Sequence, residues 1–155
     1  MPLDGDDNMF IVYFHKMLNN IQPNIKVSVD NVMERDIVCE YLTETPSIDY
    51  SNPQIQKKIH ELKKQSSDDM DYIKRSYMFV RDEIPHSWDI QADIVSKKAS
   101  DALINKTGIC WTKSCLLAAL LRANQIPSGI SYQLLALGDD ASQGHMIHAL
   151  NTVYI

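Results

Sequence analysis

The feature that most restricts the fold of this sequence is an apolar stretch between Gly108 and Pro127. Both residues suit the ends of a helix, which is expected to stop near Asn124. Its leucines occupy four positions, Leu116, Leu117, Leu120 and Leu121. They cannot share one narrow stripe, so we expect a helix that is buried on nearly all sides. Its longest wholly apolar run, Cys115 to Leu121, has seven residues, whereas a membrane-spanning helix needs roughly 20.

A buried helix needs other elements around it, and the composition suits one soluble domain. The chain has 155 residues, 45% of them hydrophobic, so we expect a single domain over 1–155 with a poorly defined region over 1–50. The net charge is -5 and no basic run is present, so neither nucleic acid nor a membrane is expected as a partner. Asp4, Asp6 and Asp7 lie where a secretory signal would carry Lys or Arg, which favours a cytoplasmic location.

Helical patterns come before the apolar helix. Asn52 and Pro53 suit the start of one helix, and the residues from Ser66 to Asp68 suit the start of a second, which Pro85 ends. The apolar positions are Ile55, Ile59 and Leu62 in the first helix and Met70, Ile73, Tyr77 and Val80 in the second. The two helices should form a hairpin, and a short third helix is expected over Ser100 to Asn105.

Strand patterns follow the apolar helix. Ile130 to Leu137 and His145 to Ile155 are expected to form an antiparallel pair that packs on it. The first fifty residues are less regular: Phe10, Phe14, Met17 and Leu18 could form a helical face, and Ile25, Val27 and Val29 alternate like a strand. The predicted fold class is therefore α+β, with helices first and the sheet last.

Three cysteines, an odd number, do not make a disulfide framework, so at least one should be a free thiol. Cys110 begins the apolar helix, and the N–H groups and positive dipole of a helix start favour the thiolate form. Cys115 lies more than one turn inside the same helix and suits the core. Cys39 is expected to be a packed thiol as well. Cys110 is therefore the candidate nucleophile.

A thiolate nucleophile needs a base, and the candidates are His145 and His148 in the last strand. Residues three apart on a strand point to opposite faces, so only one of them can reach Cys110. His148 suits the inner face of the strand, which is expected to pack on the helix that starts at Cys110, and His145 suits a position in solvent. The same alternation argues against a zinc site made of the two histidines with Cys110 and Cys115, because the four side chains could not converge. No metal and no organic cofactor are implied.

Three segments in this order resemble the bacterial transglutaminase-like domain, a family with a papain-like cysteine-protease fold. The segments are Thr107–Ser114, Leu116–Pro127 and His148–Tyr154, and Phe79–Ile84 resembles the helix that precedes the catalytic segment. The resemblance covers roughly residues 70 to 155. It implies that Cys110 is the catalytic nucleophile and that His148 is its base.

The sequence departs from the family pattern at several positions. Gln125 replaces the usual Gly, Gly129 stands where an Arg often follows Ile-Pro, Leu150 replaces a Trp, and Thr152 replaces a common Glu. The family's third catalytic residue is an Asp on the strand after the His strand, but this sequence stops at Ile155. Three alternatives remain open: the domain is truncated at its C-terminus, another residue substitutes, or the site is inactive.

The resemblance implies acyl transfer or hydrolysis on amide bonds of a peptide or protein, of the protease, amidase or transglutaminase type. The backbone N–H of Cys110 would be one donor to the oxyanion, with Trp88 and Asn105 as weak candidates for the second. The alternative is a catalytically inactive papain-like module for binding or assembly. The absent Asp and an open sheet edge after Ile155 predict weak catalysis and self-association through the C-terminal sheet edge.

Overall fold

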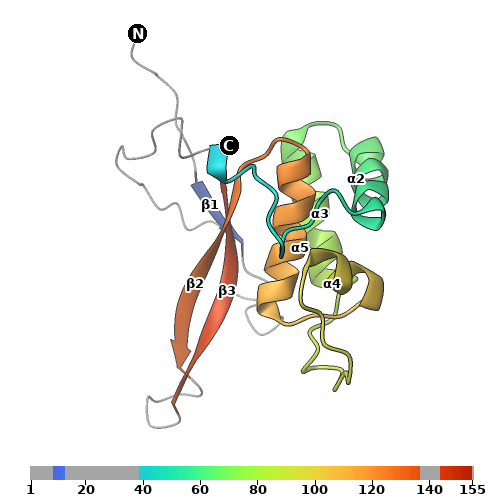
Figure 1. Cartoon of the computed structure of the whole chain (residues 1–155). Helices are drawn as coiled ribbons and strands as arrows, with labels where there is room; N and C mark the ends of the chain where they lie inside the picture. Colours follow the sequence, from blue (N-terminus) through green and yellow to red (C-terminus); the bar gives the residue numbers. More distant parts are fainter. Residues whose placement is uncertain (1–8, 13–38, 137–143, 155) are drawn as a thin grey trace.

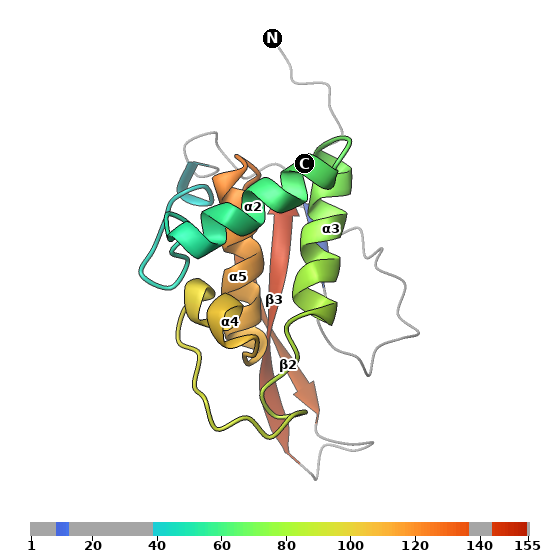
Figure 2. The same cartoon turned by 90° about the vertical axis from the view of Figure 1, so that its right-hand side faces the viewer.

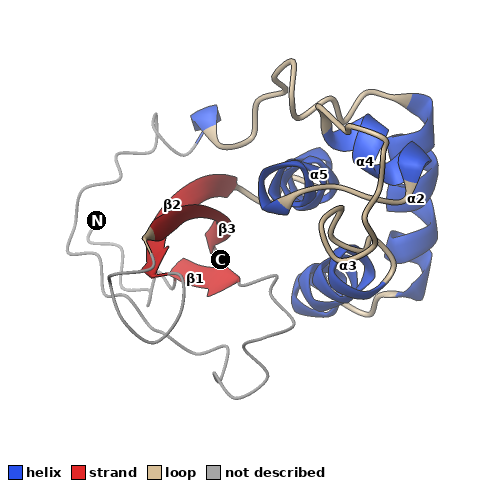
Figure 3. Cartoon of the chain, turned by 90° about the horizontal axis from the view of Figure 1, so that it is seen from below, coloured by secondary structure: helices blue, strands red, loops and turns tan. Residues whose placement is uncertain are grey.

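The fold has three layers in which one helix separates a sheet from the other helices. The computed structural model describes residues 9–12, 39–136 and 144–154. Figure 1 shows the sheet on one side of helix α5 (Cys110–Ala123), and the view from below in Figure 3 shows the other helices on the opposite side. This is the predicted α+β arrangement. Within the described ranges, no helix is long and apolar enough to cross a membrane.

The predicted helical hairpin is present as α2 (Pro53–Gln65) and α3 (Asp69–Asp82), which lie together in Figure 2. The side chain of Asn52 accepts from the Gln54 N–H, and that of Asp68 accepts from the Asp71 N–H, so both helices begin at capping residues. The apolar positions expected in α2 are buried. In α3 the prediction that Met70 belongs to the buried apolar face is wrong, since its side chain is 52% exposed. Tyr72 is buried in its place and donates to the Leu120 carbonyl of α5.

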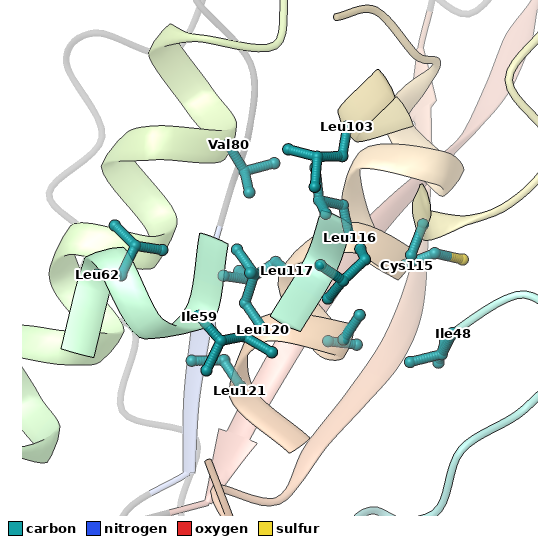
Figure 4. Close-up of a cluster of buried hydrophobic side chains, with 14 of the residues drawn as sticks. Ile48, Ile59, Leu62, Val80, Leu103, Cys115, Leu116, Leu117, Leu120 and Leu121 are labelled. Carbon is teal, nitrogen blue, oxygen red and sulfur yellow. The ribbon is translucent and has the colours of Figure 1, made fainter. Parts of the chain in front are cut away.

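Helix α5 is buried from residue 112 to residue 122, as its leucine pattern predicted. The short helix α4 (Ala99–Asn105) covers its start. Figure 4 shows the side chains of the surrounding helices meeting those of α5, among them Ile59, Val80 and Leu103. Two cations lie within this layer: Lys113 donates to the Ile84 carbonyl and Arg122 to the carbonyls of Ser128 and Thr43. Those carbonyls provide the hydrogen bonds that buried ammonium and guanidinium groups require.

The sheet contains the two predicted strands, β2 (Ser128–Ala136) and β3 (His145–Tyr154), paired antiparallel with Ser128 opposite Val153. Its third strand is a correction. The short strand β1 (Met9–Val12) pairs antiparallel with β3, so the order is β1-β3-β2 and the sheet begins at the N-terminus. The prediction of a helical face that starts at Phe10 is wrong for that residue, because Phe10 is in strand β1. The other predictions for residues 13–38 lie outside the described residues.

Strand β1 also changes the prediction of an open edge at the end of the chain. Met9 to Val12 lie opposite Tyr154 to Asn151, so the last part of β3 already has a neighbour on that side. The backbone groups that were expected to recruit another chain are therefore paired within this one.

Gln125 occupies a position that suits glycine, and its replacement gives a stability prediction. Its φ of 63° is left-handed, directly after α5, where the Gln125 N–H donates to the Arg122 carbonyl and the Ile126 N–H to the Leu121 carbonyl. Side chains disfavour this conformation. Because glycine relieves the strain but is more flexible when unfolded, Gln125→Gly should raise the free energy of unfolding by about 0.5–1 kcal/mol. Urea denaturation would measure the gain, and Gln125→Ala, which keeps a Cβ, is the matched control. A Gly variant no more stable than the Ala variant would contradict this.

Candidate active site

Cys110 is the first residue of α5 and is partly exposed. The helix start is brought close to its surroundings by Gly108, where a Cβ would lie 2.5 Å from the Thr112 hydroxyl oxygen. The Thr112 hydroxyl in turn donates to the Ile109 carbonyl. The thiol of Cys110 thus lies at the N-terminal end of a rigid, buried helix, where the helix dipole favours negative charge.

The other two thiols have different surroundings. Cys115 is fully buried in the layer between sheet and helices, as predicted, and burial raises the pKa of its thiol to about 12. It lies beside the core side chains in Figure 4. The prediction that Cys39 is packed is wrong, because its side chain is exposed. Cys39 follows the apolar residues Ile37 and Val38 in the sequence, but Cys39 and Glu40 lie in a short helical turn and are both exposed to solvent.

His148 is buried and His145 is exposed, as expected for each, but burial along β3 does not alternate: residues 145–147 are exposed and residues 148–151 are buried. Two contacts show the direction of β3 relative to α5. The Asn151 side-chain amide donates to the Ser114 carbonyl in the first half of α5 at 3.0 Å, and the Tyr154 N–H donates to the carbonyl of Pro127, which follows the end of α5, at 3.1 Å. The helix and the strand therefore run in the same direction. Cys110 lies one turn before Ser114, and His148 three residues before Asn151, so the two predicted site residues lie toward the same end of α5 and β3. Asn151 is on the face of β3 that contacts α5, and because side chains alternate along a strand, His148 leaves β3 on the opposite face.

The opposite strand adds a group beside His148 that the sequence did not reveal. Gln133 of β2 is the register partner of His148, so the two side chains project from the same face of the sheet. The Oε1 atom of Gln133 is buried and accepts no hydrogen bond from the described residues. An amide oxygen in this position can orient an imidazole by accepting its N–H.

His86 is the second group that the sequence did not reveal. Its Nε2 accepts a hydrogen bond from the Cys110 N–H at 3.1 Å. No signal in the sequence links residues 24 positions apart in this way. The contact bears on the expected oxyanion site, because the N–H that was assigned to the oxyanion is occupied by an imidazole.

The side chains of the two candidates for a second oxyanion donor have other surroundings. Trp88 is 77% exposed. The Asn105 side-chain amide donates to the Ser96 hydroxyl at 3.2 Å, and that hydroxyl donates to the Thr107 carbonyl. Asn105 therefore holds the loop before α5 in shape.

Other parts of the described structure offer no competing chemistry. Within residues 9–12, 39–136 and 144–154, no group of three histidine, cysteine or acidic side chains could hold a metal ion. A shallow hollow of about 430 Å³ lies between α2 and α3, lined by residues such as Lys58, Phe79 and Lys106. Both lysines lie over the Phe79 ring, at 4.7 and 5.7 Å from its centroid, which accounts for this cluster as a surface cation–π contact.

The surroundings of the three thiols predict their order of reactivity. We expect Cys110 to be alkylated before Cys115, since the Cys115 thiol is buried and stays protonated at neutral pH. Cys39 is exposed but belongs to no helix start of comparable length, so we expect it to react more slowly than Cys110. Timed iodoacetamide labelling followed by peptide mass spectrometry would give the three rates. Faster labelling of Cys39 or Cys115 in the folded protein would contradict the assignment of Cys110.

Comparison with known proteins gives one match. Residues 56–155 match the family model of the transglutaminase-like superfamily. This range starts within α2 and includes Cys110, His148 and the strands β2 and β3, so it covers well over half of the chain. Neither the curated proteins nor the solved structures that were searched gave a significant match.

Proposed function

This chain belongs to the transglutaminase-like superfamily, and from that premise we propose that it catalyses thiol-dependent acyl transfer on amide bonds. Cys110 is the nucleophile and His148 the base. The observation that carries the proposal is the family match over residues 56–155, a range that includes His148 and also Cys110 at the start of the buried helix α5. Three free thiols suit a reducing compartment, which supports a cytoplasmic location.

In the proposed reaction, His148 takes the proton of the Cys110 thiol and the sulfur attacks the carbonyl carbon of the substrate. A carbon–sulfur bond forms and the carbonyl oxygen becomes an oxyanion. The tetrahedral intermediate collapses, the carbon–nitrogen bond breaks, and His148 returns its proton to the leaving amine. The thioester is then attacked by water, which gives a carboxylic acid, or by a second amine, which gives a new amide. Either attack releases the Cys110 thiol.

We propose that Gln133, whose buried Oε1 accepts no hydrogen bond from the described residues, orients His148 in the reacting state. If its Oε1 accepts the Nδ1–H of His148, the Nε2 atom is left to accept the thiol proton, which is the tautomer that the reaction requires. Gln133→Leu should then lower kcat by about 10-fold to 100-fold at unchanged KM, because the ring loses its fixed tautomer. Gln133→Glu keeps an acceptor and is the matched control. Steady-state rates equal to the unmodified protein in both variants would remove Gln133 from the mechanism.

The proposal is tested by trapping the thioester. The protein is mixed with a peptide p-nitrophenyl ester, quenched in acid, and examined by intact mass and peptide mapping. The expected result is one acyl group on Cys110. Adding a primary amine such as glycine methyl ester then separates the two classes: amide product indicates a transferase, and acid product alone indicates a hydrolase. A protein that acquires no acyl group on Cys110 would overturn the proposal.

The alternative, a binding or assembly module without catalysis, is favoured by one observation. Leu134 and Ile147 are register partners on the face of the sheet opposite His148, and both are largely exposed. Exposed apolar pairs of this kind are typical of contact surfaces. If the module reading is right, Cys110 stays unacylated in the trapping experiment, and the protein instead associates through this face, with association lost in Leu134→Lys.

A further inference from the structure

The contact between His86 and Cys110 is fixed by the backbone on both sides. His86 and Gly108 form a parallel bridge, in which the Ser87 N–H donates to the Gly108 carbonyl at 3.1 Å and the Gly108 N–H donates to the Pro85 carbonyl at 3.4 Å. The hydroxyls of Ser87 and Thr107 lie 3.1 Å apart and join the same two segments. His86 is therefore held beside the start of α5 by three interactions besides its own side chain.

The His86 ring has two N–H groups close to it, one at each nitrogen. Its Nε2 lies 3.1 Å from the Cys110 nitrogen, and its Nδ1 lies 3.3 Å from the Trp88 nitrogen. A neutral imidazole has one protonated nitrogen and can accept at only the other. The two hydrogen bonds thus belong to two tautomers. One tautomer accepts from Cys110, and the other accepts from Trp88 and carries its proton on Nε2.

We propose that His86 is the second oxyanion donor of the acyl-transfer site, and that its two tautomers correspond to a resting and a working arrangement. This inference rests on the proposed function. In the resting tautomer, Nε2 accepts from the Cys110 N–H and occupies the oxyanion site. In the working tautomer, Nδ1 accepts from the Trp88 N–H, and the Nε2–H and the Cys110 N–H both donate to the oxyanion.

The exchange between these tautomers is balanced. One proton leaves Nδ1 and one is taken up at Nε2 through water, so the net charge of the ring is unchanged. The Nε2–Cys110 hydrogen bond breaks, and the Nδ1–Trp88 hydrogen bond forms in its place. An oxyanion requires donors at about 2.7–3.1 Å, so the ring turns aside to admit the substrate oxygen between the two nitrogens. The backbone bridge of His86 to Gly108 keeps the ring within reach of Cys110 during this movement.

The test compares two reactions of the same thiol in three variants of the whole chain. Acylation by a p-nitrophenyl ester passes through an oxyanion, whereas alkylation by iodoacetamide displaces iodide at a saturated carbon and forms none. His86→Leu removes both nitrogens. His86→Asn can still accept near the Trp88 N–H but is too short to donate at the Nε2 position, and His86→Gln can place an amide N–H there. Thermal unfolding followed by circular dichroism shows whether each variant is folded.

We expect His86→Leu and His86→Asn to slow acylation of Cys110 by about 10²-fold to 10³-fold, the loss typical of one oxyanion donor. Alkylation should change less than about threefold, and His86→Gln should recover most of the acylation rate. Equal acylation rates in the unmodified protein and His86→Leu would overturn the inference and leave the proposed function intact. Equal losses in acylation and alkylation would also overturn it, because His86 would then act on the thiol. An unmodified protein that is alkylated but never acylated would overturn the proposed function and this inference together.

Discussion

Cys110→Ala is expected to lower turnover of an ester or amide substrate by about 10³-fold or more, because no carbon–sulfur bond can form. The fold should survive. Cys110 is partly exposed at the start of α5, so the substitution leaves no large cavity and should change the free energy of unfolding by less than about 1 kcal/mol. The measurement is steady-state release of p-nitrophenol, with urea denaturation as the check on folding.

Cys39→Ala is the matched control for this loss. The Cys39 thiol is exposed and lies outside the interface between α5 and β3, so its removal should leave turnover within about twofold. Turnover that survives in Cys110→Ala, or that falls equally in both variants, would contradict the assignment of the nucleophile.

Leu117→Ala is expected to have the largest effect on stability. Leu117 is fully buried in α5, where helices contact one side and the sheet the other, so the lost side chain leaves a cavity that no single neighbour can fill. The free energy of unfolding should fall by about 3–4 kcal/mol. Because a domain of this size is stable by only about 5–15 kcal/mol, the variant should unfold at a much lower urea concentration.

Leu134→Ala is the matched control, since it removes the same atoms from a side chain that is 66% exposed. Its free energy of unfolding should change by less than about 0.5 kcal/mol. Equal losses in the two variants would mean that α5 is not the centre of the fold.

Two of the positions at which the sequence departs from the family pattern, Gly129 and Thr152, are neighbours in the structure. Gly129 and Thr152 lie directly opposite each other in the pairing of β2 with β3. A Cβ on Gly129 would lie 2.7 Å from the Thr152 hydroxyl oxygen and 2.9 Å from the Tyr41 ring. The positions where the family often has Arg and Glu therefore carry a small pair that Tyr41 packs against. Restoring the Arg alone would clash with both neighbours.

Local patterns predicted the helices and strands within residues 52–136 and 144–154 well. The Asn52 and Asp68 caps, the spacing of Ile55, Ile59 and Leu62, and the crowded leucines of α5 are each set by residues within one or two turns. The burial of His148 and the exposure of His145 follow instead from their positions along β3, whose first three residues are exposed and whose next four are buried. The prediction for Met70 was wrong because helical spacing alone allows more than one choice of buried face. Tyr72 is buried instead, and its hydroxyl makes a hydrogen bond to the Leu120 carbonyl that the spacing of apolar residues cannot predict.

Three features could be predicted from the amino acids alone: the order of the elements, the buried helix, and the choice of Cys110 and His148 as candidates. These follow from apolar spacing, capping and strand alternation, which act between near neighbours in the chain. Three other features are visible only in the folded chain: β1 pairs with the edge of β3, Gln133 lies opposite His148, and the Cys110 N–H donates to His86. Each of these contacts joins residues at least 15 positions apart. Loop closure and strand register bring such residues together, and neither can be predicted from the pattern of neighbouring residues in the sequence.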